Sequence, residues 1–95
     1  MRIRILGCSG GIGAGSRTSA MLVDDDVLID AGTGIGDLSL EEIDSIRHVF
    51  LTHAHLDHIA GLPMLADSVF QEDFEQPLTV YAREETLRAI QDHLF

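Results

Sequence analysis

Polar and apolar residues alternate at the start of the chain, and short apolar runs follow. Residues 2–5 alternate arginine with isoleucine, which predicts a first strand with one buried face. The apolar runs 20–23 and 27–29 flank the acidic triplet 24–26, a pattern that predicts two strands joined by a tight hairpin turn. A glycine-rich segment, residues 7–15, separates the first strand from this hairpin and predicts a loop.

The second half predicts an alternation of helices and strands. Ser39 is a candidate N-cap of a short helix, and the run 49–51 predicts a buried strand. Apolar positions in 59–70 recur at helical spacing. Pro63 interrupts this pattern, so that either a helix restarts with Pro63 in its first turn or the helix bends there.

The remaining residues predict one more strand and one more helix. Residues 78–81 favour a short strand, and the apolar positions in 87–94 lie on one face of a last helix. A hairpin that is followed by alternating strands and helices is typical of an α/β protein with helices over a mixed sheet. The chain stops on an apolar helix, as an interrupted domain would, so we expect 1–95 to form an incomplete domain.

Composition excludes several classes of protein. The chain has 95 residues, of which 45% are hydrophobic, and this suits one small globular domain. The net charge of −10 argues against general affinity for nucleic acid or anionic membrane. All six basic residues are arginine, which excludes a Walker-type phosphate loop, since that loop needs lysine. One cysteine, Cys8, excludes an internal disulfide, and we expect it to be a small, partly buried apolar residue.

Neither a secretory signal nor a membrane span is apparent in the sequence. The N-terminus lacks the continuous apolar stretch of a signal peptide, and no window reaches the roughly 18 apolar residues of a transmembrane helix. We therefore expect a soluble, cytoplasmic protein.

The segment 53–58, His-Ala-His-Leu-Asp-His, holds the strongest candidate chemistry. It contains three of the chain's five histidines and one carboxylate. Positions two apart on an extended strand point the same way, so His53 and His55 should converge. Asp57 and His58 follow at the expected start of a helix and can reach a second, adjacent point. Imidazole and carboxylate are favoured zinc ligands, so these four residues predict two neighbouring divalent metal ions.

Two other interpretations of this segment are a polar surface loop and a single structural metal site. Structural zinc sites are usually closed and rich in cysteine, which Cys8 alone cannot supply. The catalytic interpretation is therefore the favoured one.

The segment 52–58, between an apolar strand and the residues Gly-Leu-Pro, resembles the metal motif of the metallo-β-lactamase-fold hydrolases. The resemblance implies the N-terminal portion of a four-layer αββα sandwich with a dinuclear site at one sheet edge. It implies that His53 and His55 bind the first metal ion, and that Asp57 and His58 bind the second. The residues 28–32 match the family too, which implies that Asp30 orients a ligand histidine, with Thr52 beside it.

Within this superfamily, the glycine-rich segments 7–13 and 32–36, together with 16–19 and 55–59, are most similar to class II 3′,5′-cyclic-nucleotide phosphodiesterases. The resemblance implies hydrolysis of a cyclic nucleotide to the 5′-monophosphate by a hydroxide held between two metal ions, most simply zinc, with Asp57 orienting it. Weaker candidates for substrate contacts are Ser9, Ser16, Arg17 and Thr33. A ribonuclease Z-like enzyme, or another hydrolase of this fold, is the alternative.

Further metal ligands of the family should lie well beyond the first motif. Only His93 follows His58 among the histidines, and its place in the last turn of a helix favours a solvated side chain. The chain thus resembles part of a longer enzyme, and an inactive fragment stays a third alternative. We expect a cyclic nucleotide as the small-molecule partner, neither membrane nor nucleic acid, and possible homo-oligomers.

Overall fold

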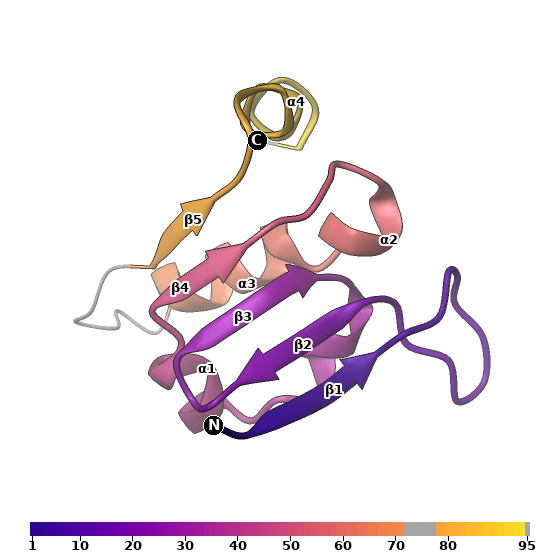
Figure 1. Cartoon of the computed structure of the whole chain (residues 1–95), viewed down its shortest axis with the longest axis vertical. Coiled ribbons are helices and arrows are strands. Elements are labelled where there is room, and N and C mark those ends of the chain that lie inside the picture. The colour runs from indigo at the N-terminus through magenta and orange to yellow at the C-terminus, as the bar shows by residue number, and fades with distance from the viewer. Residues whose placement is uncertain (72–77, 95) are drawn as a thin grey trace.

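The computed structural model describes residues 1–71 and 78–94. It contains one five-stranded mixed sheet, in which the strands follow one another in chain order (Figure 1). The first two pairings are antiparallel and the last two are parallel. The strands are β1 (Ile3–Gly7), β2 (Ala20–Val23), β3 (Val27–Ala31), β4 (His48–Phe50) and β5 (Thr79–Tyr81). The predicted strands are all present, and the α/β class is confirmed.

Helices fill the connections after β3. They are the 3₁₀ helix η1 (Thr33–Asp37) and the α-helices α1 (Leu40–Ser45), α2 (Leu56–Ile59), α3 (Leu62–Gln71) and α4 (Glu84–His93). Ser39 caps α1 as predicted: its Oγ accepts from the Glu42 backbone N–H at 3.1 Å, and the Glu42 carboxylate accepts from the Ser39 N–H at 3.0 Å. Pro63 is the second residue of α3, so the helix restarts there, with α2 as a separate turn before it.

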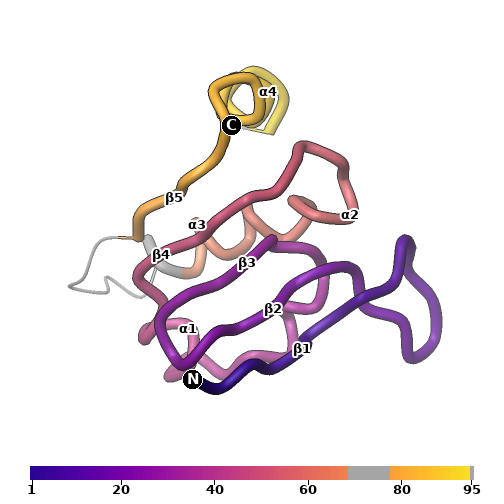
Figure 2. Tube along the Cα trace, viewed as in Figure 1, coloured from indigo at the N-terminus to yellow at the C-terminus, as the bar shows by residue number. Residues whose placement is uncertain are grey.

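The core lies on one side of the sheet. Leu28 and Val49, on the central strands, are fully buried, and Leu65 of α3 packs into the same cluster. In Figures 1 and 2, α1 and α3 lie behind the sheet, and α4 lies beyond β5 at the far end. Among the described residues, no helix is long and apolar enough to cross a membrane.

Within residues 1–71 and 78–94, no helix covers the other side of the sheet. The isoleucines of β1 were expected on a buried face, yet Ile3 is 52% and Ile5 is 56% exposed. They lie opposite α1 and α3, whereas Arg4, on the helical side, reaches Glu42 of α1. The strand prediction was therefore correct, and the burial prediction was wrong because no second layer covers these side chains.

Candidate metal centre

The predicted ligand segment connects the end of β4 to α2. Strand β4 ends at Phe50, the chain bends at Thr52, the backbone of His55 is extended, and α2 begins at Leu56. The His53 and His55 rings meet edge to face, with centroids 4.4 Å apart. The short helical turn brings the His58 ring to 3.9 Å from that of His53. The three imidazoles therefore lie together, whereas the spacing predicted that His53 and His55 converge on one point and that His58 reaches a second, adjacent one.

Asp30 anchors this cluster from the end of β3. Its side chain is buried, and its backbone adopts a left-handed conformation with φ of 61°. The carboxylate accepts hydrogen bonds from the Thr52 backbone N–H at 2.8 Å and the Thr52 hydroxyl at 2.9 Å. It also lies 2.8 Å from His58 Nδ1. Aspartate tolerates this left-handed conformation. The contacts of its carboxylate connect β3 to the ligand segment.

These contacts fix which ring nitrogens are free. Because the Asp30 carboxylate can only accept, His58 Nδ1 must carry the proton of that bond. The Thr52 hydroxyl donates to Asp30, so it accepts from His53 Nδ1, 2.9 Å away. Both rings therefore direct Nε2 away from the anchor, and Nε2 is the atom left for a ligand.

Asp57 completes the cluster of candidate ligands. Its Oδ2 atom lies 3.3 Å from His58 Nε2. In the neutral tautomer that carries its proton on Nδ1, His58 has a lone pair at Nε2, opposite the lone pairs of the Asp57 carboxylate. Such a pair is stabilised by a cation or a proton between them. Imidazole and carboxylate thus fit a divalent metal in kind, but nowhere in 1–71 or 78–94 are three or more His, Cys, Asp or Glu donors grouped to hold one ion.

Close packing of backbone supports the ligand segment. A Cβ atom added to Gly32 would lie 2.3 Å from the Asp57 carbonyl oxygen and 2.3 Å from Thr18 Oγ1. Only glycine allows this approach, so the turn after Asp30 directly supports the residue before His58. The resemblance matched residues 28–32 as a motif, but the sequence carried no signal for this contact.

Thr18, a residue that sequence analysis missed, is 3% exposed and forms a reciprocal pair with Thr33. The Thr33 hydroxyl accepts from the Thr18 backbone N–H at 2.9 Å, and the Thr18 hydroxyl accepts from the Thr33 N–H at 2.6 Å. Thr33 was predicted to contact substrate, but this hydroxyl already ties the base of the glycine-rich loop to η1. Spacing alone could not reveal the pair, since fifteen residues separate its members.

The other candidates for substrate contact lie around the glycine-rich loop. The Ser9 N–H donates to the Arg17 carbonyl at 2.9 Å, and the Ser16 N–H donates to that of Gly13 at 3.0 Å. Both bonds are made by the backbone, so neither of them uses a serine hydroxyl. Arg17 is exposed and lies 3.5 Å from Asp37 across a hollow of about 360 Å³ that Ser9 also lines.

A second hollow, of about 260 Å³, connects the uncovered sheet face with the ligand cluster. Ile5, Met21 and Ile29 line its apolar side, and Asp30 and His58 line its polar side. Cys8 also lines it and is exposed, so its predicted partial burial was wrong.

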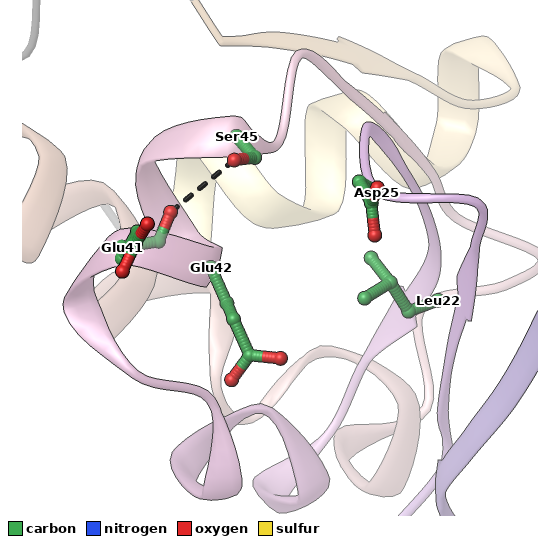
Figure 3. Close-up of a pocket in the computed structure, with 5 residues that line it drawn as sticks. All are labelled: Leu22, Asp25, Glu41, Glu42 and Ser45. Carbon is green, nitrogen blue, oxygen red and sulfur yellow. Dashed lines mark hydrogen bonds between the residues drawn. The ribbon is translucent and has the colours of Figure 1, made fainter.

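An acidic pocket between β2 and α1 is separate from this centre (Figure 3). Asp25, Glu41 and Glu42 line it, but Arg2 pairs with Asp25 and Arg4 pairs with Glu42. The Ser39 backbone N–H, and then the Arg4 guanidinium, lower the pKa of Glu42 below its usual 4.5. Glu42 therefore caps α1 and pairs with Arg4 of the edge strand, and Asp25 pairs with Arg2.

Proteins that are similar to this chain in sequence include a ribonuclease and a phosphodiesterase. The chain is 36% identical over 87 residues to a ribonuclease Z from Natronomonas pharaonis, covering 85% of this chain and 28% of that protein. It is 31% identical over 55 residues to 3′,5′-cyclic-nucleotide phosphodiesterase 1 from Saccharomyces cerevisiae, covering 58% of this chain and 15% of that protein. The chain thus spans less than a third of the length of either relative.

A solved structure has the same fold. The metallo-beta-lactamase fold protein YhfI from Bacillus subtilis superposes with a TM-score of 0.73 at 24% identity, covering 95% of this chain and 41% of that one. The family description "Metallo-beta-lactamase superfamily" matches residues 13–86, which include the whole ligand cluster and its Asp30 anchor. The chain belongs to the metallo-β-lactamase superfamily.

Proposed function

We propose that the complete gene product is a metal-dependent hydrolase of phosphodiesters. The observation that carries this proposal is the group of His53, His55, Asp57 and His58, held in place from the buried carboxylate of Asp30. Two divalent ions, most simply zinc, would each take two of these side chains as ligands. When bound, such ions supply an activated water and offset negative charge on phosphoryl oxygens.

The residues of this chain have distinct roles in the proposal. His53 and His58 would present Nε2, because Thr52 and Asp30 hold their Nδ1 atoms. Asp57 would act both as a ligand and as the group that orients the attacking water. The Ser9 and Ser16 hydroxyls and the Arg17 guanidinium, at the base of the glycine-rich loop, would contact the phosphate or the sugar.

Two phosphodiester substrates are candidates in this proposal. Similarity to a cyclic-nucleotide phosphodiesterase, together with the glycine-rich segments, supports a 3′,5′-cyclic nucleotide. Similarity to ribonuclease Z proteins extends over more of the chain and supports RNA. The net charge of −10 does not exclude RNA as a substrate. The surfaces of this chain that carry few basic residues need not be the surfaces that bind RNA.

The test is an assay of the purified complete gene product, loaded with zinc, against cyclic AMP, cyclic GMP, a precursor transfer RNA and a β-lactam. We expect hydrolysis of a phosphodiester, and Asp57→Asn should lower kcat/KM by at least about 100-fold because it removes a ligand. Asp92→Asn, an exposed carboxylate on α4, is the matched control and should leave the rate unchanged. Turnover of the β-lactam alone, or equal rates for both variants, would contradict the proposal.

A further inference from the structure

Thr18 lies at the base of the glycine-rich loop and forms three hydrogen bonds with the turn that follows β3. Its backbone N–H donates to the Thr33 hydroxyl at 2.9 Å, and its own hydroxyl accepts from the Thr33 N–H at 2.6 Å. Its carbonyl accepts from the Gly34 N–H at 3.2 Å. Because only 3% of Thr18 is exposed, water cannot readily replace these partners. The three polar groups of this residue therefore all hold residues 33 and 34.

The Thr18 hydroxyl caps η1 in place of the residue at the start of that helix. The N-cap of η1 is Gly32, which has no side chain and forms no capping hydrogen bond. A serine or threonine cannot take its place, because a Cβ atom there would overlap the Thr18 hydroxyl and the Asp57 carbonyl. The Thr33 N–H, the first of η1, is bound by Thr18 instead. Thr18 thus caps a helix that belongs to a different segment of the chain.

The same turn also contacts the helix that carries two of the candidate ligands. Gly32 packs against the carbonyl of Asp57, which lies in the first turn of α2. The Ala31 carbonyl accepts from the N–H of Gly61, just beyond the end of α2, at 2.7 Å. Residues 31–34, which we call the bridging turn, therefore contact Thr18 and both ends of α2.

The residues around Thr18 close the glycine-rich loop. Ser9 pairs with Thr18 in an isolated parallel bridge, and the Ser9 N–H donates to the Arg17 carbonyl at 2.9 Å. The loop leaves β1 and returns to β2 at this base (Figure 1). Cys8, next to Ser9, lines the hollow of about 260 Å³ that His58 also lines. The base of the loop thus borders the candidate metal centre.

We propose that Thr18 is a positioning residue, which couples the glycine-rich loop to the candidate metal centre through the bridging turn. A metal ion that holds Asp57 also holds the turn against which Asp57 packs, and the turn holds Thr18 and the base of the loop. The inference rests on the proposed function, in which the loop contacts a phosphate and must face the ions. Coupling between two sites is reciprocal. A change at Thr18 should therefore alter the affinity for metal, and metal binding should alter the loop.

The first readout is the affinity of the complete gene product for zinc, measured by competition with a chromophoric chelator. Thr18→Val keeps the size and branching of the side chain but removes the hydroxyl, which leaves the Thr33 N–H without its acceptor. We expect the Kd for zinc to rise about tenfold, as when a group that supports a metal ligand is lost. Thr18→Ser retains the hydroxyl, so its Kd should stay within about twofold of the wild-type value.

The second readout is amide hydrogen exchange at Ser9, followed by NMR spectroscopy with and without zinc. The Ser9 N–H closes the base of the loop, so its exchange reports local opening there. Zinc should slow this exchange at least about threefold in the wild-type protein and in Thr18→Ser, and should not affect it in Thr18→Val. If Thr18 contributed to stability alone, Thr18→Val would speed the exchange but would leave its dependence on zinc intact.

Thr86→Val is the matched control, because Thr86 is the other buried threonine of the described residues. It is 5% exposed and belongs to α4, which lies beyond β5 (Figure 1). The same exchange of hydroxyl for methyl should leave the Kd for zinc and the zinc dependence at Ser9 unchanged there. If circular dichroism shows that Thr18→Val is unfolded, Thr33→Val replaces it with the same two expectations, since Thr33 is only half-buried and supplies the other half of the pair.

Four results would overturn the proposal. They are a wild-type Kd for zinc in the folded valine variant, an equal loss of affinity in Thr18→Ser or Thr86→Val, exchange at Ser9 that ignores zinc in the wild-type protein, and a zinc dependence that persists without the hydroxyl. A wild-type protein that binds zinc but hydrolyses no phosphodiester would refute the proposed function alone, because neither readout depends on turnover. A wild-type protein that binds no zinc would refute both.

Discussion

Asp30→Asn is the substitution that most directly tests how the ligand cluster is held. The asparagine is isosteric and tolerates φ of 61°, and its carbonyl oxygen can still accept from the Thr52 N–H. Its NH₂ group, however, faces His58 Nδ1, which carries a proton in the wild-type protein. One charge-assisted hydrogen bond is lost, and one donor is left without a partner in a mostly buried position. The two effects together should lower the free energy of unfolding by about 2–4 kcal/mol.

The assay is urea unfolding of the metal-free chain at pH 7, followed by far-UV circular dichroism. Asp24→Asn is the matched control, because Asp24 is the other residue of the described chain that combines a side chain with positive φ, at 53°. It is exposed in the β2–β3 turn and accepts from the Arg2 N–H, so its substitution should cost less than about 0.5 kcal/mol. If the two variants lose equal stability, the buried carboxylate contacts of Asp30 contribute no more than the exposed contact of Asp24 in its turn, and the anchoring role is refuted.

Four further outcomes follow from the same structure. Gly32→Ala should cost about 1–3 kcal/mol in the same unfolding assay because its Cβ would overlap the Asp57 carbonyl, whereas Gly36→Ala, with open space around it, should be nearly neutral. Ser39→Ala should cost about 1 kcal/mol through loss of the α1 cap. Because folding lowers the pKa of Glu42, its ionised form stabilises the folded chain at pH values above the usual 4.5, and this stabilisation is lost as the pH falls below that value. Glu42→Gln should remove this pH-dependent part of the free energy of unfolding. Residues 1–95 should retain at most one zinc ion in equilibrium dialysis with elemental analysis, and two retained ions would show that the chain supplies complete coordination.

The elements were predictable because their signals are local. Alternation in residues 2–5, the acidic turn 24–26 and the cap at Ser39 each depend on residues within a few positions of one another. The same holds for the gathering of His53 and His55, which needs only the two-residue repeat of an extended chain.

Contacts between distant segments were not predictable in this way. The pairing of Thr18 with Thr33 depends on where the glycine-rich loop meets η1, and no periodicity encodes that meeting. The contact between Thr33 and Thr18 was consequently not predicted, and the predicted contact of Thr33 with substrate stays a prediction. The anchoring role of Asp30 was available only through the family resemblance, because an aspartate at the end of a strand has many possible partners.

The apolar pattern of the strands and the exposed isoleucines together indicate that the sheet is suited to a second layer. The run Val27-Leu28-Ile29 is continuous, as in a strand that is buried on both faces. The helices cover Leu28, which is fully buried, while Val27 and Ile29 on the other side are only half-buried. The sequence of this strand is suited to burial on both faces. In this structure only the face that carries Leu28 is fully buried. The hollow that Asp30 and His58 line is also lined by Ile29 on this uncovered side of the sheet, so any surface that covered this side would also border His58.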